Sequence, residues 1–278
     1  RKYIDSLPFY GRLSGTLSGS GYLDAMDIAL DWSFADARVP GNPVSLVAGD
    51  GVLGTSRDSG LTFSQFNVRR SNVDLRTVRL VAPAVILEGR LAASGTLDGP
   101  LRNIDFDGTA RHQDGERPAS QAVGTIHLDT RFDTLGLATD VTLDPLSFAG
   151  IRRAFPSLTA KGELRGTFRS QGTLSRLRVE TALAGELGDV EARGTVVLLP
   201  PHWAADDLLM RFSRLGLGHL QLGADGAHQA YVLGEPEHAI YRVLLTPAHQ
   251  LLAAEARVGS QDNLHVVEVF IPRRHPKP

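Results

Sequence analysis

The residues of this sequence that could do chemistry form only weak patterns. The segment GDGVLG, Gly49–Gly54, matches the dinucleotide-binding pattern G-x-G-x-x-G, but a second turn, TSRDSG, follows where that pattern needs a helix. The segment NIDFDG, Asn103–Gly108, offers the carboxylates of Asp105 and Asp107 for calcium. These lie on the outward parity of an expected strand and lack the remaining ligands of a calcium loop. We interpret the first segment as a strand and turn, and the second as a solvated strand face.

Metal and nucleophile chemistry find no support in the sequence. Seven of the nine histidines lie beyond residue 200 and show no H-x-H or H-x-x-x-H spacing. They are His202, His219, His228, His238, His249, His265 and His275. No G-x-S-x-G elbow occurs, and the absence of cysteine excludes disulfides, thiolate ligands and a cysteine nucleophile. We therefore expect a protein that is not an enzyme and that uses no cofactor.

Charge and hydropathy exclude further classes of partner. The 29 basic and 31 acidic residues give a formal net charge of −2, so no overall field attracts nucleic acid, and we expect no nucleic-acid partner. No apolar run approaches the roughly 20 residues that a membrane-spanning helix needs. The 278 residues and the 42% hydrophobic content are typical of a globular chain of one large or two ordinary domains.

An internal repeat is the strongest feature of the sequence. The phrase GRLSGTLSGSGYL, Gly11–Leu23, returns as GELRGTFRSQGTL, Gly162–Leu174, with its glycines and leucines in register. A shortened version, GRLAASGTLDGPL, lies between them at Gly89–Leu101. The final glycines, taken as Gly21, Gly95 and Gly172, are almost evenly spaced, which indicates a modular array.

Alternation of apolar and polar residues predicts strands. In TIHLDTRFD, Thr125–Asp133, and again from Leu158 to Leu174, apolar residues hold one parity and charged residues the other, as in a strand with one wet face. The parity shifts across Asp24-Ala25 and across Ser175-Arg176, as a two-residue hairpin turn requires, and the middle copy has the turn pair Asp98-Gly99 nearby. Each phrase is therefore expected to be a strand, a tight turn and a returning strand.

The glycines share the parity of the leucines, so they lie on the apolar face, where a missing side chain lets a sheet coil tightly. Up to about residue 199 no convincing amphipathic helix covers that face. The face is then buried by closure into a barrel, by a second sheet, or by a ligand in an open half-pipe. The expected fold is mainly β: a curled antiparallel β-sheet, half-pipe or taco-like, built of repeated hairpins.

Residues 200–278 differ from the rest, so we expect a domain boundary near Leu199. The glycine phrase does not recur there. Helix signals run from Glu235 to Gly259, interrupted by Pro247, and a short strand, His265–Ile271, precedes the basic tail PRRHPKP. The expected domains are a repeat-built sheet at 1–199 and a small mixed α/β segment at 200–278.

The repeated phrases resemble those of TamB and the wider AsmA-like envelope proteins. The resemblance covers about residues 8–199 and is carried by LPFYGRLSGTLSGSGYLDAMDIALDW, GRLAASGTLDGPLRNIDFDG and GELRGTFRSQGTLSRLRVETALAG. It implies a long curled β-sheet with a hydrophobic groove in the periplasm, or associated with a membrane, of a diderm bacterium. It also implies that such a protein moves phospholipid or assists outer-membrane protein assembly.

The residues expected to face the groove, or a closed core, are the aliphatic and aromatic members of the alternating segments. They are Leu13, Leu23, Ile28, Leu30, Trp32, Ile126, Leu128, Phe132, Leu164, Phe168, Leu174 and Val179. Burying each is worth roughly 1.5–3 kcal/mol whether the neighbour is protein or an acyl chain, so energy does not separate groove from core. The expected partners are phospholipid or other acyl chains. The alternative is a structural accessory subunit docked onto a larger membrane protein complex or an outer-membrane assembly factor.

Overall fold

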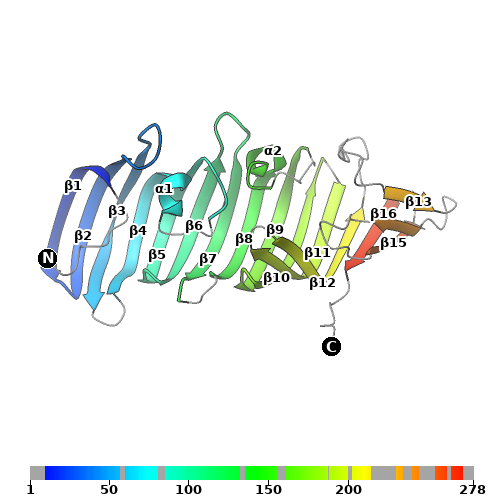
Figure 1. Ribbon diagram of the computed structural model, residues 1–278. Coiled ribbons are helices and arrows are strands. Elements are labelled where there is room, and N and C mark those ends of the chain that lie inside the picture. Colours follow the sequence, from blue (N-terminus) through cyan, green and yellow to red (C-terminus); the bar gives the residue numbers. More distant parts are fainter. Residues whose placement is uncertain are drawn as a thin grey trace.

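The computed structural model places all of the strands among its described residues in one antiparallel sheet of sixteen strands (Figure 1). It describes residues 10–56, 60–80, 85–131, 135–155, 161–186, 188–199, 202–213, 230–233, 240–243, 254–261 and 264–271. Strands β1 to β12 follow one another in chain order, and β16, β15, β14 and β13 continue the sheet beyond β12. The expected mainly β fold, a curled antiparallel sheet built of hairpins, is confirmed.

The first repeat phrase and its neighbours form β1 (Gly11–Tyr22), β2 (Ala25–Asp36), β3 (Val44–Ser56), β4 (Gly60–Asp74) and helix α1 (Leu75–Arg79). The middle of the chain forms β5 (Arg90–Pro100), β6 (Asn103–Gln113), β7 (Ser120–Asp129), β8 (Gly136–Ser147) and helix α2 (Phe148–Ile151). The remaining strands are β9 (Glu163–Thr173), β10 (Arg176–Gly185), β11 (Gly188–Leu199), β12 (His202–Ser213), β13 (Ala230–Leu233), β14 (Ile240–Val243), β15 (Ala254–Gln261) and β16 (Leu264–Ile271).

The repeat corresponds to a unit of four strands. The three glycine phrases become β1, β5 and β9, each the first strand of a unit, and short helices α1 and α2 follow the fourth strands of the first two units. In an antiparallel meander every connection from an even to an odd strand lies at the same end of the strands. Both helices therefore lie toward that end, as Figure 1 shows.

The register assigns one face of the sheet to the apolar residues. In the β9·β10 pair, Leu183 lies opposite Gly166, Thr181 opposite Phe168 and Val179 opposite Ser170. The next strand continues the same face, since Val190 of β11 lies opposite Leu183. Opposed residues of an antiparallel pair share a face, so the alternation in the sequence is carried across neighbouring strands without changing sides.

Three turns differ from the sequence expectation. The turn residues are Leu23-Asp24 and Leu174-Ser175, one position earlier than predicted, so the shift of parity was correct and its exact site was not. The predicted turn at Asp98-Gly99 was wrong: both residues belong to β5, and the turn falls at Leu101-Arg102. Gly99, not Gly95, is therefore the structural counterpart of Gly21 and Gly172, two residues before each turn.

The described residues beyond 200 are strands. β12 pairs with β11 along most of its length and so extends the sheet past the expected boundary near Leu199, which itself stays a prediction. Within the segment expected to be helical, Ile240–Val243 and Ala254–Gln261 are antiparallel strands. The rest of that expected helix, and the basic tail, lie outside the described residues. Tyrosine and β-branched residues in β14 favour the extended form over a helix.

Candidate functional site

The apolar face is the most extensive feature that could bind a ligand. Along β9 and β10 the residues on this face are buried or half-buried except Gly172 and Gly185. Those on the other face are exposed except Glu163 and Thr173. Leu164 retains only 2% of its surface and Leu177 only 1%. The described residues place no second sheet against this face, so crowding by neighbouring side chains on a curled sheet accounts for the burial.

Most of the residues predicted for the groove do share this face. Nine of them are brought to it by the register: Leu13, Ile28, Leu30, Trp32, Ile126, Leu128, Leu164, Phe168 and Val179. Leu23 and Leu174 lie instead in the two-residue turns, the first 75% exposed and the second buried. Phe132 lies outside the described residues.

Two clusters anchor the apolar face. In the first repeat, buried Ile28, Phe66 and Val68 pack with Met26, Leu30, Leu53, Phe63 and Leu97. Phe63 and Phe66 meet edge to face, with ring centroids 5.5 Å apart. In the third repeat, Leu164 and Leu183 pack with Leu143, Leu146, Val190 and Phe148, the first residue of α2. Helix α2 thus covers one end of the apolar face.

The sequence did not single out Phe63, Phe66 and Val68, because β4 breaks the simple alternation. Gln65 adopts a left-handed backbone with φ of 47°, and the register with β5 shifts between Phe63 and Phe66. A bulge adds one residue, so both phenylalanines reach the same face although they are three positions apart. The only signal in the sequence is the dense group of apolar residues in GLTFSQFNV.

The opposite face is a ladder of compensated charges. Arg169 pairs with Asp140 at 3.1 Å across β8 and β9, and Glu180 of β10 lies opposite Arg169. Arg193 of β11 in turn lies opposite Glu180, so the sign alternates from strand to strand. In the first repeat Arg70 pairs with Asp31 at 2.8 Å. Opposite charges directly across strands stabilise a sheet modestly and keep this face in water.

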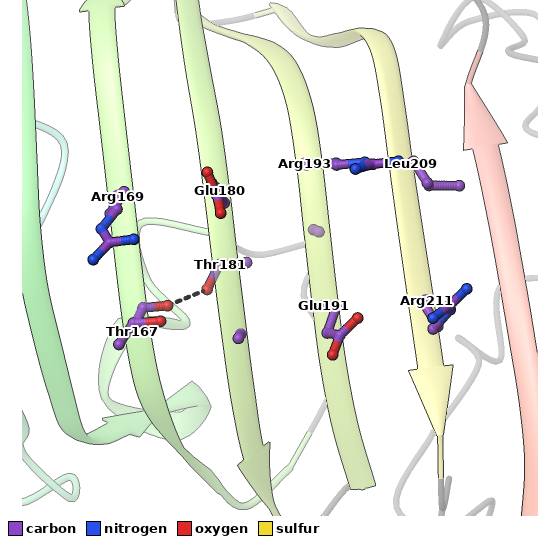
Figure 2. A pocket seen from close by; sticks show the side chains of 10 residues that line it. Thr167, Arg169, Glu180, Thr181, Glu191, Arg193, Leu209 and Arg211 are labelled. Carbon is purple, nitrogen blue, oxygen red and sulfur yellow. Dashed lines mark hydrogen bonds between the residues drawn. The ribbon is translucent and has the colours of Figure 1, made fainter.

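A shallow hollow of about 390 Å³ lies on this charged face over β9 to β12 (Figure 2). Its lining includes Arg169, Glu180, Glu191, Arg193 and Arg211, which Figure 2 shows on four neighbouring strands. Each of these charges faces one of opposite sign in the register. Because the charges compensate one another, the hollow is a weaker candidate for ligand binding than the apolar face.

A network of charges joins the connections at the helix-bearing end, and we call it the rim network. Asp114, in the β6–β7 connection, is buried and forms ion pairs with Arg117 and with Arg153, the latter at 3.1 Å. Arg153 follows α2 and also reaches Glu88 at 3.4 Å, while Arg79 of α1 lies 3.9 Å from Glu88. The rim network therefore ties the α1 connection to the α2 connection.

A second charged feature recurs at the ends of strands: an aspartate that binds the backbone just after it. The carboxylates of Asp36, Asp74 and Asp129 each accept a hydrogen bond from the backbone N–H two residues later. At Asp129 the Arg131 side chain also donates to both carboxylate oxygens, and these bonds lower the pKa of Asp129 to about 2. Burial alone would raise the pKa of Asp74, but hydrogen bonds from Arg76 outweigh it and lower that pKa.

The weak chemical motifs belong to strands. Gly49–Gly54 lies inside β3, which continues through Ser56, so no helix follows the glycines. Asp105 and Asp107 lie in β6, and Asp105 bonds to Nδ1 of His127 at 2.8 Å. Among the described residues no group of three or more His, Asp or Glu side chains could hold a metal ion.

Within the described part of the chain, no helix is long and apolar enough to cross a membrane. Comparisons with protein-family models, with curated proteins and with solved structures found no match.

Proposed function

We propose that this chain is a non-enzymatic envelope protein that shelters the acyl chains of phospholipids along its apolar face. The proposal keeps the resemblance to TamB and the AsmA-like proteins, and with it a periplasmic or membrane-associated location in a diderm bacterium. The observation that carries it is the contrast between the two faces of one sheet. One face is aliphatic over successive repeats, while the other carries compensated charges that suit water.

The energetics of the apolar face support a lipid ligand. Phe168, Val179 and Trp32 are only half-buried, although they lie on the apolar face. Each such side chain still exposes apolar area, and covering it is worth about 25 cal/mol per Å². Acyl chains have no polar atoms to satisfy, so they can cover this area without requiring hydrogen bonds from the sheet.

The test uses the absence of cysteine, which allows a single label at any position. An environment-sensitive fluorophore is attached to Phe168→Cys, on the apolar face, and to Arg169→Cys, the next residue on the charged face. Adding phosphatidylethanolamine vesicles should shift the emission to the blue at position 168 and leave position 169 unchanged. Equal spectra at both positions, before and after lipid, would contradict the proposal.

A functional measurement complements the label. Phe168→Gln should slow transfer of a fluorescent phospholipid between vesicles, with Arg169→Gln as the matched control. Mass spectrometry of protein extracted under native conditions should find phospholipid bound to the unmodified chain. Absence of bound lipid together with full transfer by Phe168→Gln would reject a lipid role.

The second candidate, a structural accessory subunit of a membrane complex, is favoured by one observation. Strand β1 is exposed along its whole length, as expected of a surface that another protein covers. The two candidates differ in what accompanies the natively extracted protein on size-exclusion chromatography. An accessory subunit elutes with a stoichiometric protein and no lipid, whereas a lipid carrier elutes alone with bound lipid.

A further inference from the structure

Strand β1 is an open edge of the sheet. All twelve of its residues are exposed, and in the described residues its only partner strand is β2. The exposed residues include Leu13 at 57% and Leu17 at 56%, both on the apolar face. An edge strand exposes unpaired backbone groups, and natural edges are usually protected by charges, proline or bulges. β1 contains one charged residue, Arg12, and no proline.

The repeat provides an internal precedent for what covers this edge. β9 carries the same phrase as β1 and pairs with its following strand in the same way, so Leu164 is the counterpart of Leu13. Leu164 is 2% exposed, because β8 pairs with the other edge of β9 and brings Leu146 opposite it. The edge of β5 is likewise covered, by β4. Among β1, β5 and β9, the strands that begin the three repeat units, only β1 has an outer edge that no described strand covers.

Half of the backbone N–H and C=O groups of β1 point away from β2, toward the outer edge of the sheet. The Ala37 N–H donates to the carbonyl oxygen of Tyr10 at 2.8 Å, and the register continues from that pair as Gly11 opposite Asp36. In an antiparallel pair such bonds alternate along the strand, so even-numbered residues of β1 bond to β2. The odd-numbered residues, including Leu13 and Leu17, direct their N–H and C=O groups away from β2.

We propose that the open edge of β1 binds an antiparallel strand of the β8 type, which the described residues do not supply. β8 places Leu137, Val141 and Leu143 opposite Gly172, Phe168 and Gly166 of β9. The counterparts of those β9 residues in β1 are Gly21, Leu17 and Gly15. The partner strand therefore carries aliphatic residues on one face, with leucines opposite Gly15 and Gly21, as recognition by strand addition requires.

The charged face shows that the partner needs no particular charge. In β8, Asp140 pairs with Arg169 and Asp144 pairs with Arg165. The counterparts of those arginines in β1 are Ser18 and Ser14, which are neutral. Recognition then depends on backbone hydrogen bonds and aliphatic side chains, and binding should be insensitive to salt. The outer backbone edge is not needed for the proposed lipid role, although Leu13 and Leu17 belong both to this edge strand and to the apolar face.

The probe is a fluorescent synthetic peptide with the sequence of β8, Gly136–Ser147, added to the full chain and followed by anisotropy. Leu17→Pro removes an outward N–H and leaves the β1–β2 hydrogen bonds in place, so it should weaken binding at least tenfold. Circular dichroism and urea unfolding check that this variant is folded. Leu17→Lys introduces a charge at the edge without changing the backbone, and it should also weaken peptide binding.

Disulfide trapping tests the register. The chain with Leu17→Cys should cross-link to the peptide carrying Val141→Cys, because these positions correspond to the Phe168 and Val141 pair, where directly opposed Cα atoms are close enough for a disulfide. The peptide with Thr142→Cys, on the opposite face, should cross-link poorly. Peptide binding unchanged by Leu17→Pro, or equal cross-linking of both peptides, would overturn the proposal. So would a Leu17→Cys chain that only cross-links to a second copy of itself.

Discussion

Gly166 of β9 lies directly opposite Leu183 of β10, and a Cβ atom placed on Gly166 would overlap the carbonyl oxygen of Ala182. The same relation recurs on the apolar face, where Leu177 lies opposite Gly172 and Val179 of β10 opposite Gly194 of β11. A large residue thus repeatedly faces a glycine. This pairing lets neighbouring strands approach closely on the side toward which the sheet curls.

Gly166→Val should strongly destabilise the sheet. Gly166 has φ of 146°, which a β-branched residue adopts only with strain, and the added side chain meets backbone that cannot move without breaking the ladder. We expect a loss of about 2 kcal/mol or more in the free energy of unfolding, measured in urea. Thr167→Val, one position along on the exposed face, is the control and should change stability little. Equal stability of the two variants would contradict the packing described here.

Leu164→Asp should unfold or greatly weaken the third repeat. The leucine is buried, and removing its packing alone costs about 2–5 kcal/mol. The carboxylate would add a further penalty, since the described side chains that pack around Leu164 are all apolar. Thr167→Asp places the same charge on the exposed face, opposite Thr142 and Ala182, and should be tolerated within about 0.5 kcal/mol. Comparable urea midpoints would show that the two faces are not distinct.

Asp129 should stabilise the protein above about pH 4 and lose this effect in acid. Its pKa of about 2 lies below the value of about 3.9 for aspartate in an unfolded chain. A group with a lowered pKa in the folded state contributes stability that is complete above the unfolded value and is lost as the pH falls through the folded value. Asp129→Asn should therefore lower stability at pH 7 and flatten the pH dependence between about 4 and 2. Carboxyl chemical shifts followed by NMR would show a midpoint near 4 if Arg131 did not hold the carboxylate.

Losing both cations that pair with Asp114 in the rim network should cost more than the sum of the single losses. With Arg117→Ala alone, Arg153 still compensates the buried carboxylate of Asp114. The double variant leaves that carboxylate without either ion pair, and such a loss costs about 3–5 kcal/mol. A double-mutant cycle in urea measures the difference. Strictly additive losses would mean that the two arginines act independently.

Arg169→Glu should weaken the charged face by a small, salt-sensitive amount. The new carboxylate would face Asp140 on one side and Glu180 on the other. Like charges directly opposed across strands destabilise by roughly 1 kcal/mol or less for exposed positions. Sodium chloride at about 1 M should recover most of the loss, because the Debye length falls to about 3 Å. A loss that salt does not reduce would point to packing and not to charge.

The strands and the repeat unit could be predicted because successive side chains of a pleated strand point to opposite faces of the sheet. Apolar and polar residues therefore alternate in the sequence. Residues Leu158–Leu174 alternate without a break, and the part of this stretch from Glu163 to Thr173 is β9. The match between Gly11–Leu23 and Gly162–Leu174 also held, since both phrases pair with their following strands in the same register. Local periodicity was sufficient there.

The irregular features, namely the true end of β5 and the bulge in β4, could not be predicted from the sequence. Asp98-Gly99 is a favourable turn pair, yet pairing of Asp98 with Asp105 extends β5 beyond it, so tertiary register prevailed over turn preference. The bulge at Gln65 hid the cluster around Phe66 by changing the parity within one strand. The apolar face as a whole was predictable, because alternation assigns residues to faces.

The rim network was not predictable at all. Glu88, Asp114 and Arg153 come from three different connections, and no spacing in the sequence relates them. Only the four-strand period, which returns α1 and α2 to the same end of the sheet, brings them together. The ion pairs between these connections could be predicted only if the four-strand period were already known.

The strand order also determines when each part of the sheet can form as the protein is synthesised. Each strand from β2 to β11 pairs with the strand made just before it and the one made just after it. A nascent chain can therefore add hairpins to an existing edge in the order of translation, without waiting for distant segments. The exception is at the other end of the described sheet: β12 pairs with β16, so β13, β14 and β15 join the sheet only after β16 has left the ribosome.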